Sequence, residues 1–180
     1  MVDRAGRPVS DHTVAFLAQT LIRAFEVPKV TRLVVDDHRA EIRRADFRSD
    51  SKIPTVALTE IHFNTIVLLT LFFALPRPLS RRQLERLVMA FSALLLTQSL
   101  NLVFHVKTLY ALGLGEWSQA HYGVVSQNVY GFLRYFFDLP GRFSFPFLLW
   151  LAFSWDTVLS LVLRHEPAAE APPKARKAKA

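Results

Sequence analysis

Three stretches of almost unbroken apolar residues dominate the chain. They run over about 59–75, 87–106 and 143–163, and the middle one reads LVMAFSALLLTQSLNLVFHV, without an acidic residue, a lysine or an arginine. A helix needs roughly 20 mostly apolar residues to cross the ~30 Å hydrocarbon core of a bilayer. Barrel strands instead alternate with a period of two over about 10 residues. The pattern therefore predicts an all-α integral membrane protein with three transmembrane helices.

Residues 1–58 carry a different pattern, typical of a small unit outside the membrane. Apolar residues that include Phe16 and Phe25 recur at near-helical spacing and predict an amphipathic helix, which lies at the interface or packs on its neighbour. A run rich in valine, 29–35, and a loosely alternating run, 40–47, flank the turn signal DDH and predict a β-hairpin. The dense charge on this hairpin is most simply a solvated face.

Two further segments complete the expected organisation. Residues 117–137 mix aromatic and polar side chains and predict an amphipathic helix in the outer interface, where tryptophan and tyrosine concentrate. A fourth span in this segment is an alternative. A turn at 139–142 leads into the last span. The domains are then the helix and hairpin segment, a membrane domain over 59–163, and a basic tail over 164–180 that is expected to be disordered.

Basic residues at the ends of the spans predict the orientation. The short connection between the first two spans holds four arginines, which are Arg77, Arg81, Arg82 and Arg86. Short loops rich in arginine stay in the cytoplasm. We therefore expect these arginines to anchor the cytoplasmic face of a bacterial inner membrane, with the C-terminus inside and residues 1–58 outside. An outside segment of this length without an export signal needs either an insertase or a transmembrane helix upstream of residue 1, and we expect the upstream helix.

The composition narrows the chemistry that the chain can perform. Its net charge is +7, and it contains no cysteine. Because the basic residues cluster at span ends and in the tail, the charge predicts contact with membrane lipids and not with nucleic acid. The lack of cysteine excludes disulfides, thiolate metal sites and a cysteine nucleophile. No H-E-x-x-H, G-x-S-x-G or phosphate-binding glycine loop occurs, so we expect no metal, no cofactor and no enzymatic activity.

Seven polar residues lie inside the predicted spans, where an ionisable group costs about 2.5–3.5 kcal/mol on insertion. They are Glu60, His62, Asn64, Gln98, Asn101, His105 and Asp156. Glu60 and Asn64 are i,i+4 neighbours and are expected to pair. Asn101 and His105 have the same spacing, and antiparallel spans would bring both pairs to one depth. Hydrogen bonds between helices, contacts with a partner membrane protein, and a Glu/His acid–base or zinc site are the three interpretations.

Several segments carry a resemblance to a known family. They are a span headed by polar residues (LTEIHFNTIVLLTLFFALP), an amphipathic stretch that ends in proline (SQNVYGFLRYFFDLP) and a last span that starts at a proline and holds a tryptophan (FSFPFLLWLAF). With the hairpin and the basic loop, they resemble the exosortase H-associated membrane proteins of Gram-negative bacteria over about residues 15–163. The family pattern includes an earlier N-terminal span that this sequence lacks. The resemblance implies an accessory role beside an exosortase and carries over no catalytic residue.

The leading hypothesis is a non-enzymatic accessory membrane protein that acts by helix–helix contact with a larger membrane partner. One competing class is an intramembrane enzyme that uses Glu60, His62 and His105. Another is a small transporter subunit, for which only Pro146 hints at a broken helix. Asp156 is expected to face Gln98 or Ser92, or to reach the interface by tilt of the last span.

Overall fold

The computed structural model describes residues 9–46 and 52–164, and at Val9 and Arg164 it describes the backbone alone. The elements in order are α1 (Val9–Ala24), β1 (Thr31–Asp36), β2 (Arg39–Arg44), β3 (Thr55–Ala57), α2 (Leu58–Phe73), α3 (Arg81–Leu112), α4 (Glu116–His121), α5 (Val124–Asp138) and α6 (Pro140–Arg164). The fold is thus mostly helical, with one small sheet. The predicted tail at 164–180 lies outside the described residues, apart from Arg164.

The predicted hairpin is confirmed, and it forms part of a three-stranded sheet. β1 and β2 pair antiparallel over their full length. The two residues between them, Asp37 and His38, have positive φ angles of 39° and 59°, as the tight type I′ hairpin turn requires. β3 was not predicted, because three residues are too few to show a period of two. It pairs antiparallel with β2 and leads directly into α2.

A first hydrophobic cluster joins the N-terminal unit to the C-terminal half of α3. Its buried residues are Val14, Ala15, Ala18, Ile22, Ala40, Ile42, Leu58, Ile61, Leu102, Val106 and Tyr110. Ala15 and Ala18 have small side chains, which let α1 lie close to its neighbours. Phe16 and Phe25 of the predicted apolar stripe are instead exposed. The expectation that the first helix packs on the rest of the fold is therefore confirmed, although its buried face is partly different.

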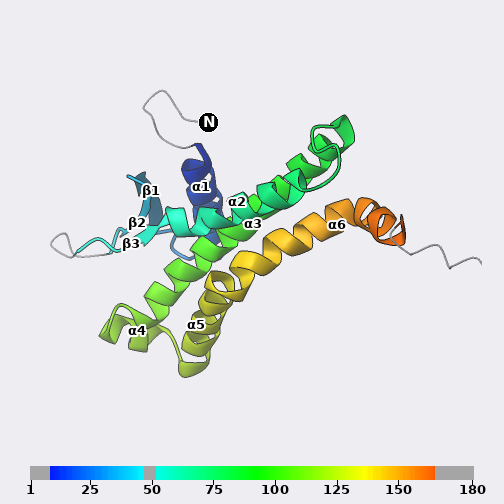
Figure 1. Cartoon of the computed structure of the whole chain (residues 1–180). Helices are drawn as coiled ribbons and strands as arrows, with labels where there is room; N and C mark the ends of the chain where they lie inside the picture. Colours follow the sequence, from blue (N-terminus) through cyan, green and yellow to red (C-terminus); the bar gives the residue numbers. More distant parts are fainter. Residues whose placement is uncertain (1–8, 47–51, 165–180) are drawn as a thin grey trace, which may run out of the picture.

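A second hydrophobic cluster lies where α2, the N-terminal half of α3 and α6 meet. Its buried residues are Leu68, Phe72, Leu75, Ala90 and Leu94, and Leu149, Trp150 and Phe153 of α6 pack against them. Since α3 has 32 residues, it is about 48 Å long and belongs to both clusters. Figure 1 shows α3 crossing the whole molecule, with α1 and the sheet on one side and α6 on the other.

The second predicted span is longer than expected at both ends. α3 begins at Arg81 and not at residue 87, because Ser80 caps it by accepting a hydrogen bond from the Gln83 backbone N–H at 3.4 Å. Most of the predicted basic connection is therefore helical. α3 continues past residue 106 and ends at Leu112, with Gly113 as its C-cap.

The predicted interfacial helix at 117–137 is divided into α4 and α5, with a break at Tyr122 and Gly123. α5 has no fully buried residue and packs against α3 and α6. The predicted turn at 139–142 is confined to Leu139, because α6 already begins at Pro140. Proline is favourable at the first helical position, where its missing N–H would have no partner.

Among the described helices, α3 and α6 are long and apolar enough to cross a membrane, judged by length and composition alone. α2 is apolar over 16 residues, or about 24 Å, which is shorter than the hydrocarbon core. The third predicted span, at 59–75, is therefore not shown at full length. α5, with 15 residues, does not provide a fourth span of sufficient length.

Candidate functional site

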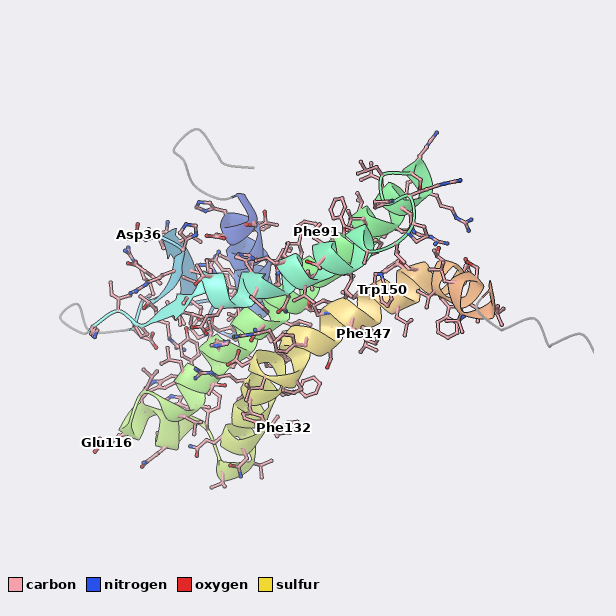
Figure 2. All side chains as sticks on the ribbon, viewed as in Figure 1. Asp36, Phe91, Glu116, Phe132, Phe147 and Trp150 are labelled. Carbon is pink, nitrogen blue, oxygen red and sulfur yellow. The ribbon has the colours of Figure 1, made fainter. Side chains whose placement is uncertain are left out.

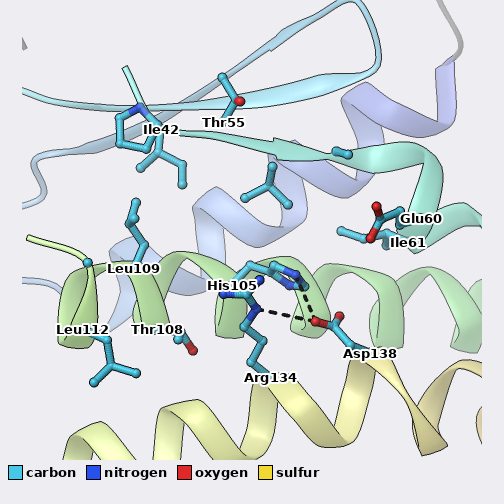
Figure 3. Close-up of a pocket in the computed structure, with 14 residues that line it drawn as sticks. Ile42, Thr55, Glu60, Ile61, His105, Thr108, Leu109, Leu112, Arg134 and Asp138 are labelled. Atoms are coloured by element: carbon cyan, nitrogen blue, oxygen red, sulfur yellow. Dashed lines mark ion pairs between the residues drawn. The ribbon is translucent and has the colours of Figure 1, made fainter. Parts of the chain in front are cut away.

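Asn101 and His105, which the sequence suggested as a pair, face a carboxylate of α5. His105 Nε2 lies 3.3 Å from Asp138 Oδ2, and Arg134 Nε lies 3.5 Å from the same oxygen, as Figure 3 shows. On the other side of the ring, His105 Nδ1 is 3.1 Å from the backbone carbonyl oxygen of Asn101. Both oxygens only accept hydrogen bonds, and a neutral imidazole has a single N–H to donate to one of them.

Asp138 is the charged centre of this group. Burial raises the pKa of Asp138, but the hydrogen bond from His105 and the charges of His105 and Arg134 outweigh it. The pKa of Asp138 is therefore held below its ordinary value of 3.8. The carboxylate is negative at neutral pH, and its contact with His105 joins α5 to α3.

Glu60 lies across a cavity of about 410 Å³ from this ion pair, and Figure 3 shows the two on opposite walls. Its side chain is 71% exposed, and Oε2 lies 3.8 Å from Arg142 Nη2 of α6. Asn64 is buried instead, and its Oδ1 has no hydrogen-bond partner. Glu60 therefore does not pair with Asn64 as expected, although Glu60 and His105 line one cavity.

His62 turns away from this group and toward α1. Its Nε2 lies 2.8 Å from Asp11 Oδ1, out of line for a hydrogen bond. His38 of the hairpin turn places Nδ1 2.9 Å from Oδ2 of the same carboxylate. Asp11 is only 1% exposed. Within the described ranges, no group of three or more histidine, aspartate or glutamate side chains is arranged to hold a metal ion.

Some polar side chains in the apolar stretch of α3 have partners within or between helices, whereas Gln98 Oε1 and Asn101 Oδ1 are buried without one. Ser92 and Ser99 donate to the backbone carbonyl four residues earlier, at 2.9 and 2.8 Å. Gln98 Nε2 donates to Thr65 Oγ1 of α2 at 3.0 Å, an interhelical hydrogen bond of the kind suggested by the sequence. Hydrocarbon requires such internal partners, because it offers none of its own.

At the opposite end of α3, Asp156 of α6 meets the arginines. Its Oδ2 lies 3.1 Å from Arg86 Nη2 and 3.7 Å from Arg82 Nη2. Asp156 therefore does not face Gln98 or Ser92. It lies within the last apolar stretch, because the mostly apolar residues 157–163 follow it in α6. The alternative, that it reaches the interface by tilt of this span, stays a prediction.

The remaining two arginines lie at the same end. Arg81 Nε is 3.1 Å from Glu85 Oε1, one turn further along α3. Arg77 is exposed in the connection between α2 and α3. All four arginines thus mark one end of the bundle of apolar helices.

Arg44 is a buried charge that the sequence analysis assigned to a solvated face. Its side chain is 10% exposed, and its guanidinium carbon lies 4.8 Å from the ring centres of both Tyr110 and Trp117. It also hydrogen-bonds Asp46, which lowers the pKa of that carboxyl below its ordinary 3.8. The burial of Arg44 could have been predicted from the alternation of side chains along the strand. Residues two apart share a face, and Ile42, two residues earlier, is buried.

No known protein family, no curated protein and no solved structure matches this chain. The resemblance to the exosortase H-associated proteins therefore depends on the sequence segments quoted above and stays a prediction. What the residues themselves offer is a polar group at each end of an apolar bundle, and a buried carboxylate between two imidazoles.

Proposed function

We propose that the chain is an accessory protein embedded in a bacterial membrane, which acts by helix–helix contact with a larger membrane protein and not by its own catalysis. Two layers of charged side chains support the embedding. One contains Arg86 and Asp156, and the other contains His105 and Asp138. From Arg86 to His105, α3 rises about 28 Å without a charged residue. This distance is close to the ~30 Å of the hydrocarbon core.

The apolar surface between the two layers is mostly uncovered, and this observation carries the proposal. Only 11% of the apolar 18-residue window of α6 is buried, and only 33% of that of α3. A core helix of a water-soluble protein is mostly buried, and large contiguous apolar patches on soluble proteins are rare. Figure 2 labels Phe147 on α6, which is 48% exposed. Such a surface requires lipid or protein around it.

In this proposal α2 is the third span, although it is short. A bilayer accommodates a short apolar helix by local thinning, or by flanking side chains that extend to the interface. The arginine end of the bundle then lies in the cytoplasm with the end of α6, and the sheet with α1 lies outside.

A shallow groove between α2 and α6 supports contact with a partner helix. Val67 and Leu71 of α2 and Phe143, Ser144 and Phe147 of α6 line about 390 Å³ of space. Lipid tails provide no hydrophobic force between helices, so close packing at small residues such as Ser144 drives association. We assign the groove to one transmembrane helix of the partner. An exosortase is the first candidate partner, because the sequence resemblance implies one.

Site-specific photocrosslinking in the source bacterium tests this assignment. Benzoylphenylalanine is placed at Leu71 or Ser144 in the groove, and at Leu96 of α3 as a control that is 55% exposed and outside the groove. We expect irradiation to join the two groove positions, but not the control, to one larger membrane protein that mass spectrometry identifies. Equal adducts at all three positions, or adducts only between copies of this chain, would contradict the proposal.

A further inference from the structure

A second cavity, of about 640 Å³, lies between α1, α2 and α3, and its size is typical of sites for small ligands. Its polar end is formed by Asp11, His38 and His62, and its apolar end by Phe63, Ile66, Phe91 and Leu95. This cavity is separate from the one beside His105. Its walls are therefore suited to an amphiphile, with a polar group at one end and a hydrocarbon at the other.

The polar end presents one buried carboxylate between two imidazoles. Among the described residues, the ion-pair partners of Asp11 are both histidines, which carry charge only when protonated. A neutral His38 ring that directs its Nδ1–H toward Asp11 keeps Nε2 as an acceptor. The side chain of His38 is 52% exposed, so its ring is open to a ligand. A negative charge with nearby acceptors suits a group that is cationic and donates hydrogen bonds.

The apolar end is open to the side. Phe63 is 40% exposed and Ile66 is 62% exposed, and both lie on α2 at the level of the uncharged stretch of α3. Phe91 and Leu95 of α3 also line this end. Gln98 lines the cavity as well, and its buried Oε1 has no hydrogen-bond partner. A chain that enters from the hydrocarbon would meet this opening directly.

We infer that the cavity binds one phospholipid with an ethanolamine headgroup, its ammonium at the polar end and one acyl chain along Ile66 and Leu95. Phosphatidylglycerol offers no cation for Asp11, and a choline headgroup has no N–H to donate, so ethanolamine fits best. The inference rests on the membrane embedding proposed above. It does not depend on any protein partner.

Native mass spectrometry of the full chain tests this inference. The protein is released from nanodiscs that hold equal amounts of phosphatidylethanolamine and phosphatidylglycerol with the same acyl chains. We expect one retained lipid per chain and a preference for ethanolamine of about tenfold, the effect of one hydrogen bond to a charged group. Asp11→Asn should abolish the preference. Asp37→Asn, the same change at an exposed position of the hairpin turn, should keep it.

A second pair of variants tests the opening without disturbing the buried carboxylate. Ile66→Trp adds bulk at the exposed edge of the cavity and should retain neither of the two lipids. Leu96→Trp adds the same bulk at an outward position of α3, which is 55% exposed, and should retain them. Circular dichroism confirms that each variant is helical before its lipids are compared.

Three results would overturn the inference. Equal retention of the two lipids by the unmodified chain, or an unchanged preference in Asp11→Asn, rejects the headgroup. Equal retention by Ile66→Trp and Leu96→Trp rejects the cavity. A zinc adduct that Asp11→Asn removes, with no retained lipid, assigns the polar end to a metal instead. Alkaline carbonate extraction of the host membranes tests the embedding separately, so its failure is distinguishable from failure of lipid binding.

Discussion

Gln98 is a buried polar residue whose replacement by an apolar one we expect to stabilise the protein. Its amide nitrogen donates to Thr65 Oγ1 at 3.0 Å, whereas its Oε1 is buried without a partner. Losing the hydrogen bond costs about 0.6 kcal/mol between membrane helices. Removing a buried, unsatisfied polar atom gains about 1–3 kcal/mol. Gln98→Leu should therefore raise the free energy of unfolding by about 0.5–2 kcal/mol.

Reversible unfolding in mixed micelles of dodecylmaltoside and SDS, followed by far-ultraviolet circular dichroism, measures this change. Thr65→Val is the matched variant, because it removes the acceptor and leaves the whole Gln98 amide unsatisfied, so it should destabilise the protein by about 1 kcal/mol. The double variant should resemble Gln98→Leu and not Thr65→Val. A loss of more than about 1 kcal/mol in Gln98→Leu would refute this reasoning, because it would require a favourable contact of Oε1.

Three further predictions follow from burial, charge and orientation. Leu102 is fully buried, so Leu102→Ala should lower the free energy of unfolding by about 2–5 kcal/mol. Leu96→Ala, on the exposed side of the same helix, should lower it by less than about 0.5 kcal/mol. Equal losses for the two variants in the same assay would contradict this packing. The pKa of Asp138 is lowered in the folded state from its ordinary 3.8. The contribution of this carboxylate to the free energy of unfolding is therefore complete above pH 3.8 and is lost as the pH falls through the folded pKa. Asp138→Asn should lower the free energy of unfolding by up to about 1 kcal/mol at neutral pH and leave it unchanged in acid. A loss of stability that does not depend on pH would show that the charge is not its cause. In the proposed orientation Arg82 and Arg86 lie at the cytoplasmic end of the bundle. A C-terminal alkaline phosphatase fusion should then be inactive and a C-terminal fluorescent protein bright, and the opposite pattern would reverse the orientation.

Local signals predicted most of the elements, and residues without local signals were missed. Continuous apolar runs predicted α3 and α6, and the turn signal at Asp37 and His38 predicted the hairpin. β3 forms only because the chain returns to β2, so no local pattern marks it. The buried face of α1 depends on close approach at Ala15 and Ala18, whereas the sequence drew attention to Phe16, which is 66% exposed. Small residues carry little hydrophobic signal, even where they determine packing.

Among the polar residues, too, those marked by their neighbours in sequence could be predicted, whereas contacts between separate elements could not. His105 could be identified because it interrupts an apolar run, but its partner Asp138 belongs to a different helix and carries no comparable signal. Asp11 stands at the start of α1, where an acidic residue is common, so nothing local predicts its burial. It becomes buried only when α1, the hairpin turn and α2 come together, which places His38 and His62 against it.

Because α3 runs for 32 residues without proline or glycine, it can act as a stiff lever. A rotation of about 5° about its midpoint would move each tip by about 2 Å. Force applied near Arg82 would then displace Tyr110, on which the sheet rests through Arg44. Spin labels at the two tips, measured with and without a bound partner, would detect such tilting. In the proposed membrane embedding, movement at one face of the bilayer would thus be transmitted to the other face by a single helix.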